Sequence, residues 1–456
     1  MARSELSTAR IISIACAIAA TYLATSMGTA VSLILPRIAS EFHLTGSQVQ
    51  WILTGYLLAR VGMLSPSGAL CDVYGTRRVF ILGIGIFSVS TFFCAFLSNP
   101  DHLVIARMAQ GASAALLSPS SLVLLRQSVS IEREAGAVSL WSMAGIAGVA
   151  LSPVFGGLLM EVWDWEAVFL FSAIATALVG LIYAFFGFSS PVVKTSATRW
   201  PAIKKDLTRS VWLVALAFLF CQGNFKAAAV LAVLVAGFIL FKNYRATAGT
   251  NVANAYWARL PIIAAGLFGF AAVASGLLWG AYFIQGDLRL SAMVYGLSCV
   301  PMAVTGIISC VVTNALLAAK RVATAITLAS VIVAIVAVIA YFAEKTSSHT
   351  LAVVALAFVG LCFGLINGAV SAAMFDAYPK NESGDASSIA ALSKQFGQLV
   401  GLTVVGAYRE LSGALVGSDV MLFVFIAASA AVMMICAAFI ARRKAQSHPR
   451  GMATPC

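Results

Sequence analysis

Long apolar segments alternate with short polar ones along the whole chain. Twelve of the apolar segments have about the 20 residues that an α-helix needs to cross a bilayer. They cover Ile11–Leu35, Val49–Leu70, Val79–Ser98, Leu103–Leu125, Gly136–Met160, Ala167–Phe188, Leu260–Phe283, Met293–Leu317, Val322–Ala343, Leu351–Phe375, Ala386–Tyr408 and Val420–Ala441. Each is predicted to be a membrane-spanning helix.

A shorter pair of apolar segments, Leu207–Gln222 and Ala227–Phe241, follows the sixth segment and a basic linker. Because both are shorter than an ordinary span, a re-entrant hairpin and one long broken helix are open alternatives to two crossings. Two crossings place 21 of the 29 Lys and Arg residues on one side and five on the other. A single crossing puts the basic C-terminal tail outside, against the tendency of basic residues to stay in the cytoplasm.

The pattern therefore predicts an all-α, multi-pass membrane protein with fourteen helices and with both termini in the cytoplasm. A faint repeat supports two equivalent halves, because Arg77-Arg78-Val79 and Lys320-Arg321-Val322 occupy corresponding loops. The predicted divisions are an N-terminal six-helix half (1–188), a linker with the central pair (189–258), a C-terminal six-helix half (259–441) and a cytoplasmic tail (442–456).

Composition agrees with a chain whose solvent is lipid. Hydrophobic residues make up 61% of the sequence and charged residues only 10%, against about 25% charged in soluble domains. The net charge of +12 sits at predicted helix ends, where it sets orientation, so no nucleic-acid partner is expected. The nine cysteines are spread through apolar segments and are interpreted as packing residues, not as metal ligands or disulfides.

Three basic residues, Arg60, Arg107 and Lys394, lie inside predicted spans, whereas no carboxylate or histidine lies in the middle of one. An embedded charge is costly and usually faces a polar cavity. Arg60 has Tyr56 one turn earlier, and Lys394 has Gln398 one turn later. Two other interpretations stay open: Arg60 bonded to carbonyls or amides of neighbouring helices, and Arg107 or Lys394 reaching the membrane surface.

The loop between the second and third segments resembles the signature of the major facilitator superfamily. Gly68, Leu70, Asp72, Gly75 and Arg77 match the pattern Gly-x-Leu-Ala-Asp-x-x-Gly-Arg-Arg/Lys, Arg78 follows, and Thr76 departs from it. The resemblance implies that Asp72 helps to latch the cytoplasmic gate. A plain turn with basic residues is the alternative.

Two more segments are similar to superfamily motifs. Arg107, Gln110 and Gly111 match the Arg-x-x-Gln-Gly signature of the fourth span, which implies a place for Arg107 and Gln110 in the substrate cavity. In the fifth span, Gly148, Pro153, Gly156 and Gly157 match the antiporter motif Gly-x-x-x-Gly-Pro-x-x-Gly-Gly, with Ser152 in place of Gly. In the family, this motif accompanies export. Small residues four apart also predict close helix packing.

Together with the six-two-six plan, these motifs resemble the fourteen-helix drug:proton antiporter family over nearly the whole chain. The chain departs from that family in the first span, where Met27 stands in place of the usual Asp and is expected to face the substrate cavity. Embedded carboxylates are the groups that pair with cationic drugs. A cavity with basic groups instead is expected to favour anionic, zwitterionic or neutral substrates.

The resemblance implies a small-molecule exporter of the inner membrane that works as a monomer, without a cofactor, on the proton gradient. The proton carrier is an open question, with Asp72, Asp287 and Lys394 as candidates, since a buried lysine can lose its proton. An importer or uniporter of the same fold is the main alternative. A non-transporting sensor and a membrane enzyme are others, and the sequence offers no catalytic cluster for the last.

Overall fold

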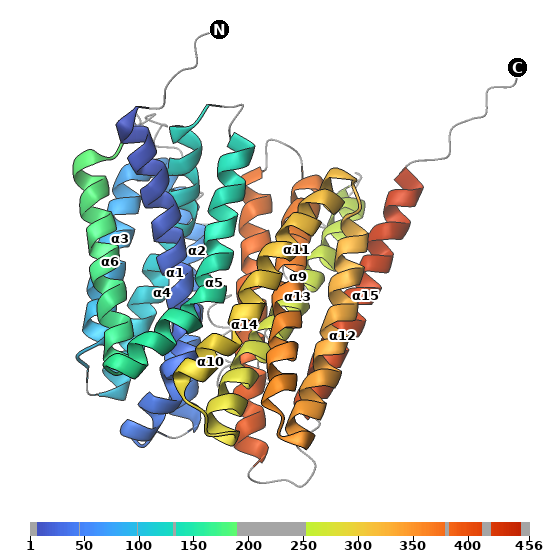
Figure 1. The fold of residues 1–456 in the computed structure, drawn as a ribbon. Helices are drawn as coiled ribbons and strands as arrows, with labels where there is room; N and C mark the ends of the chain where they lie inside the picture. The colour runs from blue at the N-terminus through green and yellow to red at the C-terminus, as the bar shows by residue number, and fades with distance from the viewer. Residues whose placement is uncertain are drawn as a thin grey trace, which may run out of the picture.

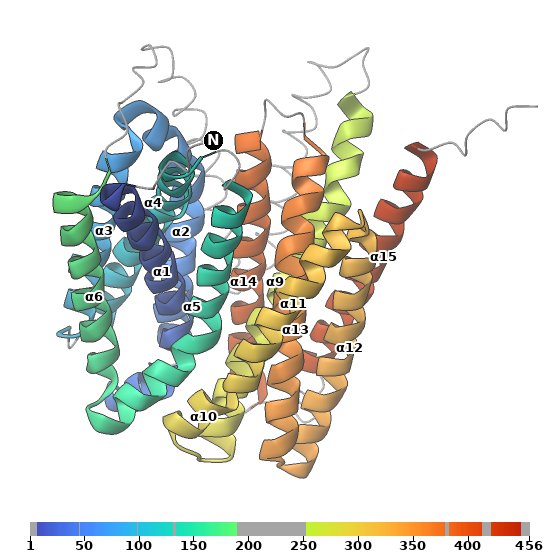
Figure 2. The same cartoon turned by 45° about the horizontal axis from the view of Figure 1, so that its top comes forward.

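In the computed structural model, residues 7–44, 46–97, 99–130, 134–188, 252–378, 383–412 and 421–447 are described. Their helices form two bundles that stand side by side in both views (Figure 1, Figure 2). The first bundle contains α1 (Thr8–Glu41), α2 (Gly46–Tyr74), α3 (Thr76–Cys94), α4 (Pro100–Ser128), α5 (Glu134–Val162) and α6 (Trp165–Phe186). The second contains α9 (Val252–Tyr282), α10 (Ala292–Ser298), α11 (Val300–Ala318), α12 (Val322–Thr346), α13 (His349–Asp376), α14 (Ser383–Ser412) and α15 (Met421–Ser447).

The twelve spans predicted outside the central pair all appear as helices, which confirms that part of the prediction. Within the described ranges, nine helices are long and apolar enough to cross a membrane, or ten with the bent helix α5. The eighth span is made of α10 and α11 together, and α9 ends in a short π-helix, Phe283–Asp287. The predicted central pair and most of its linker lie in 189–251, outside the described residues.

Helices α1 and α15 place the start and the end of the described chain at the same end of the molecule, the top in Figure 1. Successive spans run up and down, so Arg77, Arg126 and Arg321 also lie at this end, which we call the basic end. At the opposite end, Arg37 Nη2 lies 3.0 Å from Asp164 Oδ2 and joins α1 to the start of α6. The hydrogen bond from Arg37 holds the pKa of the Asp164 carboxyl below its usual value.

Glycines bring the helices of each bundle into close contact. A methyl group on Gly148 of α5 would collide with Thr25 Oγ1 and lie 2.6 Å from the Tyr22 carbonyl of α1. On α14, Gly397 and Gly401 lie so close to the backbone of α9 that a methyl group on either would also collide with it. Ser275 Oγ of α9 donates to the Gly401 carbonyl at 3.1 Å. These small residues let backbones approach in lipid, where packing replaces the hydrophobic effect between helices.

Helix α5 bends by 40° between Val149 and Leu151. Pro153 has no N–H to bond the Val149 carbonyl four residues earlier. Ser152 Oγ donates to that carbonyl at 3.2 Å and lies 2.6 Å from Thr29 Oγ1 of α1. A serine before the proline therefore satisfies a carbonyl that the proline frees, which a glycine at this position would leave without a side-chain partner.

Replacing Gly148 with Ala should lower the stability of the protein, because the new methyl group has no room against α1. The expected loss is about 1–3 kcal/mol, as for other overpacked sites. Thermal unfolding of the purified protein in detergent measures it. Gly85→Ala on α3 is the matched control, since open space surrounds Gly85. Equal midpoints for the two variants would contradict the packing described for α5.

Candidate functional site

A cavity of about 230 Å³ lies between the two bundles at the middle of their height. Helices α1, α2, α4 and α5 form its wall on one side, and α9, α13 and α14 form it on the other. Pockets that bind small molecules are typically apolar with a few polar groups that fix orientation. The polar groups on this wall therefore indicate what the cavity can hold.

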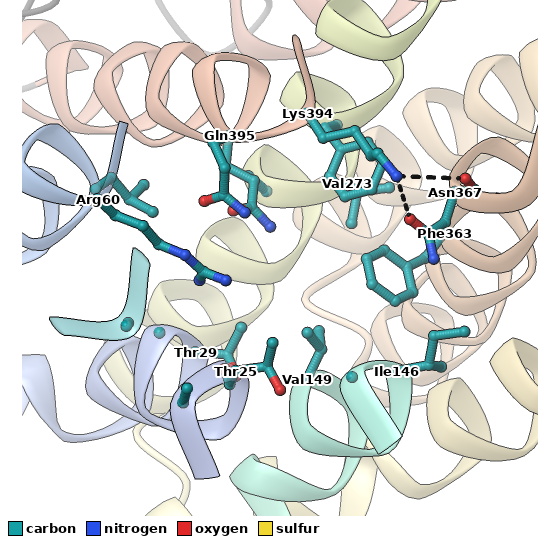
Figure 3. A pocket seen from close by; sticks show the side chains of 18 of the residues that line it. Thr25, Thr29, Arg60, Ile146, Val149, Val273, Phe363, Asn367, Lys394 and Gln395 are labelled. Atoms are coloured by element: carbon teal, nitrogen blue, oxygen red, sulfur yellow. Dashed lines mark hydrogen bonds between the residues drawn. The ribbon is translucent and has the colours of Figure 1, made fainter. Parts of the chain in front are cut away.

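Arg60 of α2 lies on the cavity wall, and its guanidinium points toward the centre (Figure 3). The side chain is only 8% exposed. Its Nη1 donates to Tyr56 Oη at 3.4 Å, and its Nε has no hydrogen-bond partner. The charge is thus held in place with donor capacity left over, as a receptor for an acidic group requires.

Lys394 of α14 lies on the other bundle's wall and is fixed by α13. Its Nζ donates to Ser371 Oγ at 2.7 Å, to Asn367 Oδ1 at 2.9 Å and to the Asn367 carbonyl at 3.5 Å. An ammonium has three protons to donate, so these oxygens match its capacity. All three oxygens are neutral, and the positive charge is therefore solvated without being cancelled.

Neutral groups complete the wall. Thr25 and Thr29 of α1 supply hydroxyls, and Gln395 lies between Arg60 and Lys394 in Figure 3. The Gln395 Oε1 atom is buried and accepts no hydrogen bond. Phe270 and Phe363, with ring centroids 5.5 Å apart, form an aromatic surface on the side of the second bundle.

No Asp, Glu or His is found among the described residues that line the cavity. The ionisable groups on the wall are Arg60 and Lys394, one from each bundle. Since the described lining residues include no carboxylate, these two groups give the described wall a positive charge. Of the residues that the sequence suggested for the cavity, Arg60, Lys394 and Gln398 lie on it.

Arg107, Gln110 and Tyr56 lie behind the wall, contrary to the expectation that they face the cavity. Arg107 is fully buried between α4 and α2, with its guanidinium carbon 4.5 Å from the centroid of the Tyr56 ring. Its Nε donates to the Ile52 carbonyl at 3.2 Å, and its Nη1 donates to Gln110 Oε1. Stacking on an aromatic face and bonds to two oxygens stabilise the buried charge, while Nη2 has no hydrogen-bond partner. Arg107 thus joins two helices of one bundle.

Tyr56 connects this network to the cavity. Its hydroxyl donates to the Ala24 carbonyl of α1 at 2.9 Å and accepts from Arg60. The side-chain nitrogen of Gln110, Nε2, donates to Thr91 Oγ1 of α3 at 2.6 Å. Polar contacts thus link α1, α2, α3 and α4 behind the wall. Met27, also predicted for the cavity, is 3% exposed and packs in the apolar core.

The loop with the superfamily signature lies at the basic end. Gly75 caps α3 with a φ of 85°, a conformation that favours glycine. Gly68 lies inside α2, with no side chain within reach, and so does not form a turn. Arg77 Nη2 donates to the Ala184 carbonyl of α6 at 2.8 Å. Arg78 is exposed, and the side chain of Asp72 lies outside the described part, so its role as a latch stays a prediction.

The antiporter-like segment of α5 contacts both bundles. A methyl group on Gly156 would lie 2.6 Å from Leu33 Cδ2 of α1. One on Gly157 would lie 2.9 Å from the Ala292 carbonyl of α10, and Gly296 of α10 packs on the Pro153 carbonyl. The two bundles therefore touch through α5 and α10 at the end opposite the basic end.

Sequence comparisons give the chain relatives over most of its length. It is 26% identical to the methylenomycin A resistance protein of Streptomyces coelicolor over 84% of this chain and 82% of that protein. It is 27% identical to the protein of that name in Bacillus subtilis, over 86% and 85%. A tetracenomycin C resistance and export protein of Streptomyces glaucescens is 34% identical, over 34% of this chain and 29% of that protein.

The fold is also similar to solved structures. A POT family transporter in complex with 5-aminolevulinic acid superposes with a TM-score of 0.71 over 96% of each chain, at 15% identity. At this identity the likeness concerns the fold alone. The sequence model of the Major Facilitator Superfamily matches residues 14–402. The protein is therefore a multi-pass membrane transporter that belongs to the Major Facilitator Superfamily.

Proposed function

We propose that the protein exports small organic molecules that are anionic, zwitterionic or neutral. The observation that carries this proposal is the charge of the cavity wall, where Arg60 and Lys394 face a space without a carboxylate among its described lining residues. A lipophilic cation entering this cavity would meet two positive charges and no counter-ion. Specificity of this kind is a repulsion of the wrong ligand as well as an attraction of the right one.

Relatives favour export over import. Two of the relatives above are named as resistance proteins and one as a resistance and export protein. The antiporter-like segment of α5 supports the same direction. The protein would act as a monomer, because both bundles that form the cavity belong to one chain.

Basic residues favour an orientation in the inner membrane with both termini in the cytoplasm. Arg77, Arg126 and Arg321 share the end at which the described chain begins and finishes. Cytoplasmic loops carry such an excess of Lys and Arg. The basic end would therefore face the cytoplasm, and the α5–α10 contact would face outward.

Contacts at the two ends support loading from the cytoplasm. At the outward end, Gly157 and Gly296 hold α5 against α10 across the two bundles. At the basic end, Arg77 bonds α6 within its own bundle, and Arg259 bonds the Ala377 carbonyl within the other. A carrier that alternates access would open the contact between the bundles at the outward end, and close the bundles on each other at the basic end, when it releases its substrate outside.

Proton coupling would run through Lys394. An arginine stays protonated in proteins. Lys394 is therefore the ionisable group on the described wall that can release and regain a proton. Antiport through this lysine requires that its protonated form and a bound substrate ammonium compete for the same oxygen partners.

Everted vesicles from a host without its own pumps test the charge preference. We expect them to accumulate coumarin carboxylate, a small fluorescent anion, and to exclude a coumarin of similar size with a trimethylammonium group. Arg60→Gln should reduce anion uptake about tenfold or more, the cost of one hydrogen bond to a charged group. Arg442→Gln is the control, because Arg442 is exposed at the end of α15. Uptake of the cation, unaffected by either variant, would overturn the proposal.

Nigericin in potassium medium tests proton coupling, because it removes the pH gradient and leaves the membrane potential. Transport by the wild type should fall to the level of passive leak. Lys394→Met should transport at that level with or without the gradient, and Lys345→Met, changed at the outward end, should behave as the wild type. Wild-type transport that continues unchanged after nigericin would exclude coupling to protons.

A further inference from the structure

We infer that the cavity selects a zwitterion with an apolar body, whose ammonium displaces Lys394 from Asn367 and Ser371 while its acidic group binds Arg60. This inference rests on the proposed export function and narrows its substrate class. It starts from the unequal hydrogen bonding of the two cations on the wall.

Arg60 offers free donors, whereas Lys394 does not. The Arg60 guanidinium makes one long bond of 3.4 Å, to Tyr56 Oη, and its Nε has no partner. The Lys394 ammonium already donates to three oxygens. An acidic ligand therefore gains most at Arg60, where charge-assisted bonds are still to be made.

Asn367, Ser371 and Gln395 supply acceptor oxygens to the wall. Gln395 Oε1 is buried without a partner, and a buried polar atom left unpaired costs free energy. Asn367 Oδ1 and Ser371 Oγ hold an ammonium, which makes them a site for a second ammonium once Lys394 leaves. A purely anionic ligand uses none of these acceptors. A ligand with an acid at one end and an ammonium at the other uses both the donors of Arg60 and these acceptors.

The aromatic side of the cavity receives the body of the ligand. Phe270 and Phe363 are buried, and their rings meet edge to face on the wall near Lys394. Their surface is apolar, and burial of apolar ligand surface on it stabilises the complex by roughly 25 cal/mol per Å². The ligand class is thus an amino acid-like compound with an aromatic or aliphatic body.

Displacement of Lys394 makes substrate and proton compete. Two ammonium groups cannot share three oxygens, because like charges at that distance repel. When Lys394 loses one proton to water at the cytoplasmic side, the substrate ammonium takes the oxygens. When Lys394 gains a proton from the outside, it reclaims them and the substrate leaves. In each half of the cycle, an N–H bond of Lys394 and an O–H bond of water are exchanged, and the net result is antiport.

The described residues around Lys394 include no competing acid. Helix α14 packs on α9, α13, α2 and α15. Toward the lysine, α9 presents Phe270, α13 presents Asn367 and Ser371, and α2 presents Arg60 as the facing charge. Helix α15 contributes no described residue to the cavity wall. A purely anionic ligand would bind best with Lys394 protonated, so its affinity would fall as pH rises. A zwitterion that displaces the ammonium binds better as pH rises.

Three probes with one phenyl body separate these possibilities: L-phenylalanine, phenylpropionate and phenethylamine. Binding to the purified protein in detergent is measured by isothermal titration. We expect phenylalanine to bind about tenfold more tightly than either analogue, since each lacks one charge-assisted contact. Its affinity should rise with pH over the range in which its own amino group stays protonated, because deprotonation of Lys394 frees the three oxygens.

Variants assign the two ends of the probe. Arg60→Gln should bind phenylalanine no more tightly than phenethylamine, because the contact to the carboxylate is lost. Asn367→Ala should bind phenylalanine no more tightly than phenylpropionate, because the contact to the ammonium is lost. Lys394→Arg should bind phenylalanine weakly and without the pH dependence, because arginine does not release its proton. Asn314→Ala, on an exposed position of α11, is the control. Thermal unfolding of each variant shows that it is folded.

Any of three results would overturn this inference. They are phenylpropionate binding as tightly as phenylalanine, an affinity for phenylalanine that falls as pH rises, and no binding of any probe. Export of coumarin carboxylate by the same preparation would then still support the proposed function. Failure of all export, with phenylalanine bound as described, would reject the export function and leave the ligand class standing.

Discussion

Positive charge with no counter-ion among the described residues governs the centre of this transporter. Arg60 and Lys394 stand in the low-dielectric interior of the bundle, where each charge is held by neutral hydrogen-bond partners and not by a carboxylate. An embedded charge of this kind costs several kcal/mol unless the cavity or its ligand solvates it. The cost is the reason why these two residues indicate a function, since apolar side chains of similar size would pack there without it.

The remaining structure keeps the two charges apart and in place. Tyr56 fixes Arg60 and stacks on Arg107, so the first bundle carries its charge on a rigid polar network. In the second bundle, Gly397 and Gly401 press α14 onto α9, while Asn367 and Ser371 fix Lys394 from α13. Because each charge belongs to a different bundle, the proposed ligand, which neutralises one and replaces the other, would bridge the two halves. Its binding would therefore be linked to the movement of one half against the other.

Sequence patterns predicted the spans well and the site in part. Hydropathy places a helix in lipid, so the bounds of the spans agree with those of the helices within a few residues to about a turn or two, although most helices extend beyond the bilayer core. Hydropathy also places Arg60, Arg107 and Lys394 at depth, but depth does not say which way a side chain faces. Arg107 faces α2 because the Tyr56 ring offers it a partner, and that contact depends on the packing of two helices far apart in sequence.

Asn367, Ser371 and Gln395 were missed because neutral polar residues give a weak signal in an apolar segment. Asn367 does interrupt the apolar run of α13, and its spacing of four from Ser371 puts both on one face. These observations point to a polar stripe, but they do not reveal that Lys394 of the next helix is its partner. For Ser152, in contrast, neighbouring residues explain the departure from the motif, because its hydroxyl bonds the carbonyl that Pro153 leaves free.

A structure of the protein in a lipid nanodisc with iodophenylalanine bound would show how the cavity holds a zwitterion, since the iodine marks the aromatic body and fixes the orientation of the ligand. We expect the ligand carboxylate at the Arg60 guanidinium, the iodine near Phe270 and Phe363, and the Lys394 ammonium moved away from Asn367. A carboxylate bound elsewhere, with Arg60 turned onto carbonyls of neighbouring helices, would contradict this expectation.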